Sequence, residues 1–269
     1  MHVRDLGLGP PVVFLHPGPG LDGSVFLPGA ERLAEAGHRV LLADLPGNGR
    51  SPDGDRNDWT LAGFARAVER LAAELDLRDW TLLGHSFGGF VALQHLMDFP
   101  GSAARLVASC TDASETPAPG ALEDPTEGLS PELAEQVQEG LAREQVASTP
   151  EQVHEAWRLQ FPLFAERPEP LEAMLAEVVF RPAVARPRDW GDLEALAALA
   201  ATQTPVLAIG AEHDRATPPE AARRIAATAP GGDLLMIEGA GHFPFADAPE
   251  RYWPGLEDWL RRTPVGSRA

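Results

Sequence analysis

A serine at position 86 has the neighbours that nucleophilic chemistry requires. Residues 84–89 read Gly84-His85-Ser86-Phe87-Gly88-Gly89 and directly follow the apolar run 80–83. Such a segment has the form of a nucleophile elbow, in which a strand turns sharply into a helix and holds the serine Oγ at the apex. The glycines leave space for the tight turn, and an apolar helical pattern follows up to Pro100. The pattern therefore predicts an exposed nucleophile rather than an ordinary glycine-rich turn.

A serine hydroxyl needs a base to take its proton, and the base needs an acid to hold it in one tautomer. Asp214 follows the strand-like run 206–210, and His242 follows the run 234–237. The order Ser86, Asp214, His242 matches the order serine, acid, histidine of one known triad arrangement. We expect all three on loops at the same edge of a sheet.

Other residues compete for these roles. The chain has eight histidines, of which His213 is the closest rival to His242 as the base. His213 adjoins Asp214 and would be too close in sequence to face it across a site. Glu212 and Asp112 are alternatives for the acid, and Asp112 could reach the same histidine from a different loop. Gly210 and Pro218 frame a tight loop around Asp214, which favours Asp214.

Backbone N–H groups must stabilise the oxyanion that such a reaction forms. One donor is expected from Phe87, at the start of the helix behind Ser86. The second is expected from the loop His16-Pro17-Gly18-Pro19-Gly20. Prolines have no N–H, so Gly18 is the best placed donor in that loop.

The elements that position these residues alternate between short apolar runs and helical patterns. Runs at 12–15, 39–43, 80–83, 105–110, 206–209 and 234–237 are expected to be strands. Helices are expected at 27–36, from Thr60, after Ser86, at 192–200, from Pro218 to Ile225 and from Pro249 onward, with Pro254 kinking or splitting the last. This alternation predicts an α/β fold with a mostly parallel, doubly wound sheet.

The alternation fails between about residues 112 and 191. A linker at 111–131 precedes helical patterns at about 131–146, 150–164 and 168–180. We therefore expect an α/β core at 1–111 and 192–269, with a helical cap inserted at 112–191 over the carboxyl ends of the strands. Trp157, Phe161, Glu155 and Phe243 are candidates for contact with substrate, although cap-to-core packing is the common role of such aromatic residues.

Composition narrows the class of protein. The formal net charge is −18, which argues against binding to nucleic acid or to anionic membranes. All the basic residues are Arg; without Lys, a Schiff-base mechanism is excluded. No apolar run is long enough to span a bilayer, and the N-terminus lacks a signal-peptide pattern. The single Cys110 permits no internal disulfide, so we expect a cytoplasmic protein with Cys110 as a buried apolar residue.

Taken together, these segments resemble the α/β-hydrolase superfamily. The matching parts are the 16–20 loop, the turn at Asp44–Ser51, the elbow around Ser86, the Asp214 loop and Gly241-His242. The resemblance implies the α/β-hydrolase fold with a helical cap, an acyl-enzyme intermediate on Ser86, and no cofactor or metal. The Pro19-Gly20 ending and the segment Phe243–Glu250 look similar to those of proline iminopeptidases, which recognise a free amino terminus through cap carboxylates.

This resemblance favours a serine hydrolase acting on a small ester, amide or short peptide. A proline-iminopeptidase-like aminopeptidase is the leading expectation. A carboxylesterase or lactonase, a C–C bond hydrolase and a ligand-binding receptor with little turnover are the alternatives. The oligomeric state is not readable from the sequence.

Overall fold

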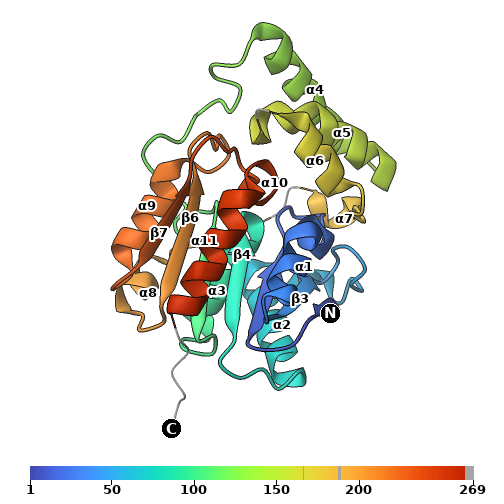
Figure 1. Ribbon diagram of the computed structural model, residues 1–269. Coiled ribbons are helices and arrows are strands. Elements are labelled where there is room, and N and C mark those ends of the chain that lie inside the picture. Colours follow the sequence, from blue (N-terminus) through green and yellow to red (C-terminus); the bar gives the residue numbers. More distant parts are fainter. Residues whose placement is uncertain (166, 187–188, 264–269) are drawn as a thin grey trace.

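A single sheet organises the protein. The computed structural model describes residues 1–165, 167–186 and 189–263, and seven strands run through the centre of this part of the chain (Figure 1). Their spatial order is β1-β3-β2-β4-β5-β6-β7. Only β1 is antiparallel to its neighbour among these strands. The strands are β1 His2–Leu6, β2 Pro11–Leu15, β3 Arg39–Asp44, β4 Thr81–His85, β5 Arg105–Ser109, β6 Val206–Ala211 and β7 Asp233–Ile237.

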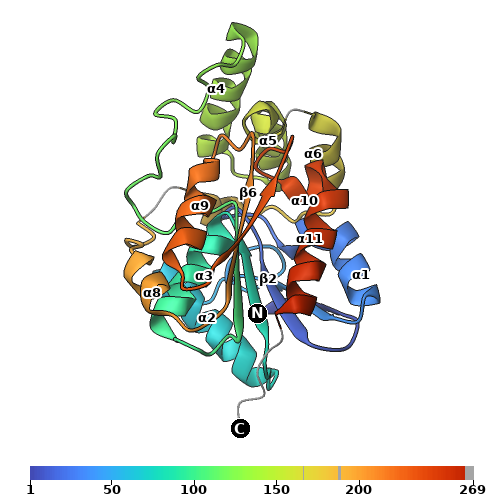
Figure 2. The same cartoon turned by 60° about the vertical axis from the view of Figure 1, so that its left-hand side comes forward.

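Helices cover both faces of the sheet (Figure 2). Side chains alternate along each strand, so that Val12 and Phe14 pack in one core cluster while Val13 and Leu15 pack in another. The first cluster includes α1 Leu27–Glu35 and α11 Pro249–Arg262. The second includes α2 Leu61–Glu74, α3 Phe87–Asp98, α8 Leu196–Ala201 and α9 Pro219–Thr228. The predicted doubly wound α/β fold is confirmed.

Four helices lie between β5 and α8 in the sequence and stand above the sheet in Figure 1. They are α4 Pro131–Val146, α5 Pro150–Phe164, α6 Pro168–Leu175 and α7 Pro182–Ala185, here called the cap helices. Three shorter elements complete the described chain: the 3₁₀ turns Gly23–Phe26 and Arg56–Asp58, and α10 Pro244–Asp247. No helix in the described part of the chain combines the length and apolar character needed to cross a membrane.

The cap helices are tied to the core by buried and half-buried polar contacts. The carboxylate of Asp22, which is fully buried, accepts hydrogen bonds from the backbone N–H of Val179 at 2.9 Å and from the Arg50 guanidinium at 2.8 Å. The backbone N–H of Arg181 donates to the carbonyl of Gly20 at 2.9 Å, and its side chain pairs with Asp53 at 2.5 Å. These contacts join the end of the cap to the loops that follow β2 and β3.

Four predictions about individual elements were incomplete or wrong. The helix expected at 192–200 begins only at Leu196, because Glu194 lies in an isolated bridge with Ser114. No strand was predicted at His2–Leu6, yet β1 pairs with β3 as an edge strand. The helix expected at 168–180 ends at Leu175, because the backbone N–H of Val179 turns away to donate to Asp22. The helix α11 continues without a break through Pro254. Its buried side chains Trp253 and Leu256 hold it against the sheet, and this packing outweighs the one hydrogen bond that the proline removes.

Candidate active site

Ser86 occupies a strained turn between β4 and α3. Its backbone has φ 52° and ψ −119°, a conformation that costs a non-glycine residue about 1–3 kcal/mol. Its neighbours leave no room to relax: a Cβ on Gly84 would lie 2.1 Å from the Gly88 carbonyl oxygen, and one on Gly88 would lie 2.3 Å from that of Leu15. The Ser86 N–H donates to the Ser109 carbonyl at 2.9 Å. The turn therefore presents the Ser86 side chain at the end of the sheet, partly exposed.

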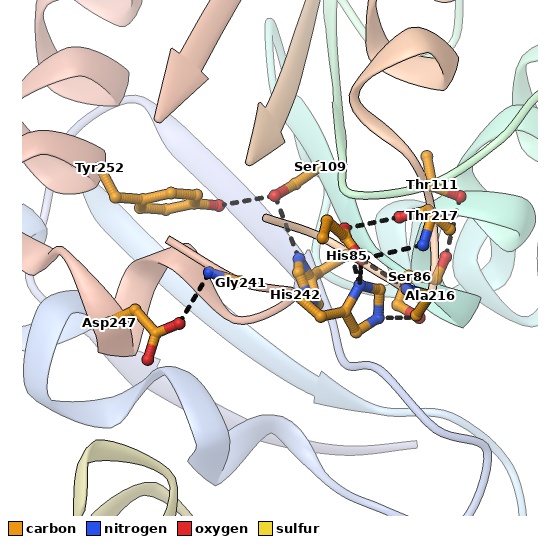
Figure 3. A network of polar contacts seen from close by, with 11 residues as sticks. His85, Ser86, Ser109, Thr111, Ala216, Thr217, Gly241, His242, Asp247 and Tyr252 are labelled. Carbon is orange, nitrogen blue, oxygen red and sulfur yellow. Dashed lines mark hydrogen bonds and ion pairs between the residues drawn. The ribbon is translucent and has the colours of Figure 1, made fainter. Parts of the chain in front are cut away.

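His242 and Asp214 complete a hydrogen-bonded line with Ser86. Figure 3 shows the contact between His242 and Ser86. The His242 Nε2 atom lies 2.9 Å from the Ser86 Oγ atom. On the other side of the ring, Nδ1 lies 2.9 and 3.0 Å from the two Asp214 carboxylate oxygens. A carboxylate can only accept, so the ring proton is on Nδ1 and the lone pair of Nε2 faces the serine hydroxyl. Both His242 and Asp214 are buried.

The loop after β6 fixes the orientation of the Asp214 carboxylate. Oδ1 accepts hydrogen bonds from the backbone N–H groups of Ala216 and Thr217, both at 2.9 Å. Oδ2 accepts one from the Thr217 hydroxyl at 2.8 Å. The His242 loop is held from the cap, because the His242 N–H donates to the Phe164 carbonyl at 2.7 Å. The hydrogen bond from Thr217 and the backbone contact of Phe164 were not expected from the sequence. The available signal for Thr217 was its hydroxyl, three residues after the acid.

Gly18 and Phe87, the residues expected to supply backbone N–H donors, border the same hollow. This hollow has a volume of about 710 Å³ and is here called the first hollow. Gly18 has φ +121°, which favours glycine, and Phe87 begins α3. Within the described part of the chain, neither N–H donates to another residue. Both groups are therefore available to a negatively charged oxygen in the first hollow.

The rival candidates lie elsewhere. Asp112 forms an ion pair with Arg224, Glu212 accepts from the Gly239 N–H at 2.9 Å, and His213 is partly exposed. None of these three is placed against the Nδ1 atom of His242.

His85 is buried directly behind His242, with 5.2 Å between the two ring centroids. Its Nδ1 atom lies 3.1 Å from the Ser109 hydroxyl, which lies 3.3 Å from the Tyr252 hydroxyl (Figure 3). Burial lowers the pKa of His85 well below its ordinary value. His85 therefore stays neutral near pH 7. Ser109 and Tyr252 were missed by the sequence analysis, since their positions depend on the packing of α11 against β5.

Cys110 is buried, as expected, and lies beside the same carboxylate. The Cys110 sulfur, an Asp214 oxygen and a His242 nitrogen lie within 4.8 Å of one another, a spacing that could hold a metal ion. An ion there would have to displace the hydrogen bond between His242 and Asp214. It would also have to displace the thiol proton, because burial raises the pKa of Cys110 well above its ordinary value. The set of contacts fits the serine chemistry better than metal binding.

The four residues expected to contact substrate have different environments. Trp157 is buried, stacks on Phe164 at 5.2 Å and donates to Glu144 at 2.9 Å. Phe243 is buried in the core against His85 and His242. Both belong to packing, and neither lines the first hollow. Glu155 is exposed near Arg158.

Phe161 is the member of this group that lines a hollow, the second one described below. Aromatic spacing on a helix could not separate it from Trp157, because both lie on the inner side of α5.

Comparison with known proteins identifies the family. The family model for the alpha/beta hydrolase fold matches residues 10–249. The chain belongs to this family. The match includes Ser86, Asp214 and His242 and runs through the cap helices.

Relatives and solved structures extend the comparison. The chain is 30% identical over 267 residues to a pimeloyl-[acyl-carrier protein] methyl ester esterase from Stenotrophomonas maltophilia, covering 97% of this chain and 96% of the relative. It is 25% identical to a thermophilic esterase from Thermogutta terrifontis, with a TM-score of 0.74 and coverage of 97% and 93%. An alpha/beta fold family hydrolase from Bacillus anthracis has a TM-score of 0.76 at 19% identity, covering 96% of this chain and 94% of its own. The last likeness shows the fold alone.

Proposed function

We propose that the protein is a carboxylic ester hydrolase that works through an acyl-enzyme on Ser86. The observation that carries this proposal is the unbroken line from the Ser86 Oγ atom through His242 to Asp214, with contacts of 2.9 Å on both sides of the imidazole. Two similar proteins are named as esterases, which supports esters over amides as the substrate class.

The proposed reaction follows from these contacts. The Ser86 oxygen bonds to the ester carbonyl carbon while His242 Nε2 takes the hydroxyl proton, and the carbonyl electron pair moves onto its oxygen. The N–H groups of Gly18 and Phe87 donate to that oxyanion. The bond to the alcohol then breaks, and the departing oxygen takes the proton from His242. A water molecule repeats both steps on the acyl-enzyme, releasing the acid and restoring Ser86.

An aminopeptidase of the proline-iminopeptidase type receives less support. The comparisons give no aminopeptidase among the proteins described above, and Glu155 is exposed to solvent. A C–C bond hydrolase would use the same three side chains, and no observation in the site favours it.

Hydrolysis of p-nitrophenyl acetate and butyrate tests the proposal, alongside Pro- and Ala-arylamides. We expect turnover of the esters and little of the arylamides. The Ser86→Ala variant should lose turnover by several orders of magnitude, and should lose covalent labelling by a fluorophosphonate. Ser148→Ala, which changes an exposed hydroxyl ahead of α5, is the matched control and should keep both. Turnover of arylamides without esters, or labelling that survives Ser86→Ala, would contradict the proposal.

A further inference from the structure

A second hollow of about 700 Å³ adjoins the first. It lies between the loop that carries Asp214 and the cap helices α4 and α5. Leu122 and Pro218 line both hollows, so the two meet at these side chains. Each hollow has a size ordinary for a small-molecule site.

The second hollow presents apolar side chains to solvent. Leu122, Leu129, Leu133, Phe161 and Leu163 line it. Leu122 and Leu133 are 36% and 40% exposed, and they are two of only five large hydrophobic residues with such exposure in the described chain. Exposed apolar side chains gathered around one concave surface indicate a ligand site more than chance exposure does.

The first hollow combines acidic and apolar side chains. Four carboxylates line it, those of Asp112, Glu115, Asp189 and Asp192. Asp112 is neutralised by Arg224, and the other three residues are exposed. The second hollow also has charged side chains, among them Arg215 and Glu220, but its wall beside α4 and α5 is formed by leucines and Phe161. That wall is where an apolar chain would bury its surface.

The second hollow is also close to the reacting atoms. Asp214 itself lines it, and so does Phe161 of α5. Three residues further along α5 lies Phe164, whose ring centroid is 5.8 Å from that of His242. The second hollow therefore adjoins the acid that contacts His242, on the cap side of the site.

We infer that the substrate is an ester with a long apolar chain, whose ester group lies at Ser86 and whose chain lies in the second hollow. This inference rests on the proposed esterase function. Leu122 and Leu133 are then residues that determine chain-length specificity without taking part in the chemistry.

Two ester series test the inference: p-nitrophenyl esters from acetyl to dodecanoyl, and acetate esters of alcohols of the same lengths. The first detects a chain on the acid side and the second a chain on the alcohol side. In one of them kcat/KM should rise with length, by up to about fourfold per methylene, until the second hollow is filled. A flat or falling dependence in both series, with acetyl esters still hydrolysed, would overturn the inference and leave the esterase proposal standing. No hydrolysis of any ester would refute both.

Variants locate the effect in the second hollow. Leu133→Glu should lower the ratio of octyl-chain to acetyl-ester kcat/KM at least about tenfold, and Leu122→Trp should shorten the preferred chain. Val146→Glu is the matched control, since Val146 ends the same helix α4, is 78% exposed and does not line the hollow. An equal ratio in Leu133→Glu and Val146→Glu would contradict the inference. Turnover of the acetyl ester by Leu133→Glu shows that this variant is folded.

Discussion

At the scale of residues, the surroundings of His242 favour transient protonation of its imidazole ring. In the proposed reaction His242 takes the serine proton and becomes a cation, 5.2 Å from the ring of His85. Two unit charges at this distance would repel each other by about 3 kcal/mol at an effective dielectric constant of 20. Burial keeps His85 neutral, so this repulsion is avoided. Asp214 on the opposite side supplies the compensating charge.

Replacing Asp214 by Asn tests the role of that charge. We expect kcat for a short ester to fall by about 10³- to 10⁴-fold, because an amide can donate to Nδ1 and favour the wrong tautomer of His242. Steady-state kinetics measures the effect. Asp112→Asn is the control: its carboxylate pairs with Arg224, so it should keep kcat within a fewfold of the parent. A larger loss in Asp112→Asn than in Asp214→Asn would make Asp112 the acid.

Thr217 is expected to orient the Asp214 carboxylate and not to take part in the reaction itself. Thr217→Val removes the hydroxyl that donates to Oδ2 at 2.8 Å. It should lower kcat about tenfold or more, because a hydrogen bond to a charged group contributes about 1.5–3 kcal/mol. Thr217→Ser restores a hydroxyl and should restore kcat. If the serine variant is as slow as the valine variant, the methyl group and not the hydroxyl is what matters.

At the scale of elements, the close approach of α3 to β2 is what holds Ser86 in its strained turn. A Cβ at position 88 would overlap the Leu15 carbonyl oxygen at 2.3 Å. The helix cannot move away without shifting Phe87, one of the two expected oxyanion donors, and Ser86 with it. The strain of the turn is therefore sustained by packing at the start of α3.

Two glycine variants separate lack of space from backbone conformation. Gly88→Ala should destabilise the protein by about 3 kcal/mol or more, because the new methyl group overlaps backbone atoms. Gly37→Ala introduces a methyl group with nothing within 4 Å, and only its φ of +95° is unfavourable, so about 1–2 kcal/mol is expected. Urea unfolding of both variants measures the difference. Equal losses of stability would mean that close packing at Gly88 is not the constraint.

The elements that carry motifs were predictable from the sequence, because each motif stands at the end of an apolar run. Ser86, Asp214 and His242 follow β4, β6 and β7, and parallel strands bring their carboxyl ends to one edge. The cap could be foreseen only as helices. Which of its side chains line a hollow depends on how residues 112–130 cross between α4 and the Asp214 loop, and helical periodicity contains no information on that. The short strand β1 was also not predicted, because charged side chains at this sheet edge interrupt the alternation of apolar and polar residues.

At the scale of the whole molecule, buried neutral histidines link stability to pH. His16 and His85 are fully buried, and burial lowers the pKa of each in the folded protein. In the unfolded chain both titrate near 6.5. Below that pH the unfolded state binds more protons than the folded state, so the free energy of unfolding falls as pH falls.

Urea unfolding at pH 7.5, 6.5 and 5.5 checks this dependence. Stability should change little between pH 7.5 and 6.5. It should then fall by up to about 1.4 kcal/mol per pH unit for each of the two histidines, as long as the pH stays above their folded pKa. His85→Asn should show a shallower fall over the same interval. A stability that rises on acidification to pH 5.5 would show that these side chains are not held neutral.

The base of the cap has one further consequence. Two backbone hydrogen bonds join the segment that follows β5 to the segment that precedes α8. They run from Ala195 N–H to the Ala113 carbonyl at 2.8 Å and from Glu115 N–H to the Leu193 carbonyl at 3.1 Å. The inserted segment of nearly eighty residues thus begins and ends at neighbouring positions on the core, held together by these two hydrogen bonds. Such a junction allows the inserted segment to be replaced, in evolution or by design, without moving Ser86, Asp214 and His242. New substrates could then be acquired without a change in the chemistry of the site.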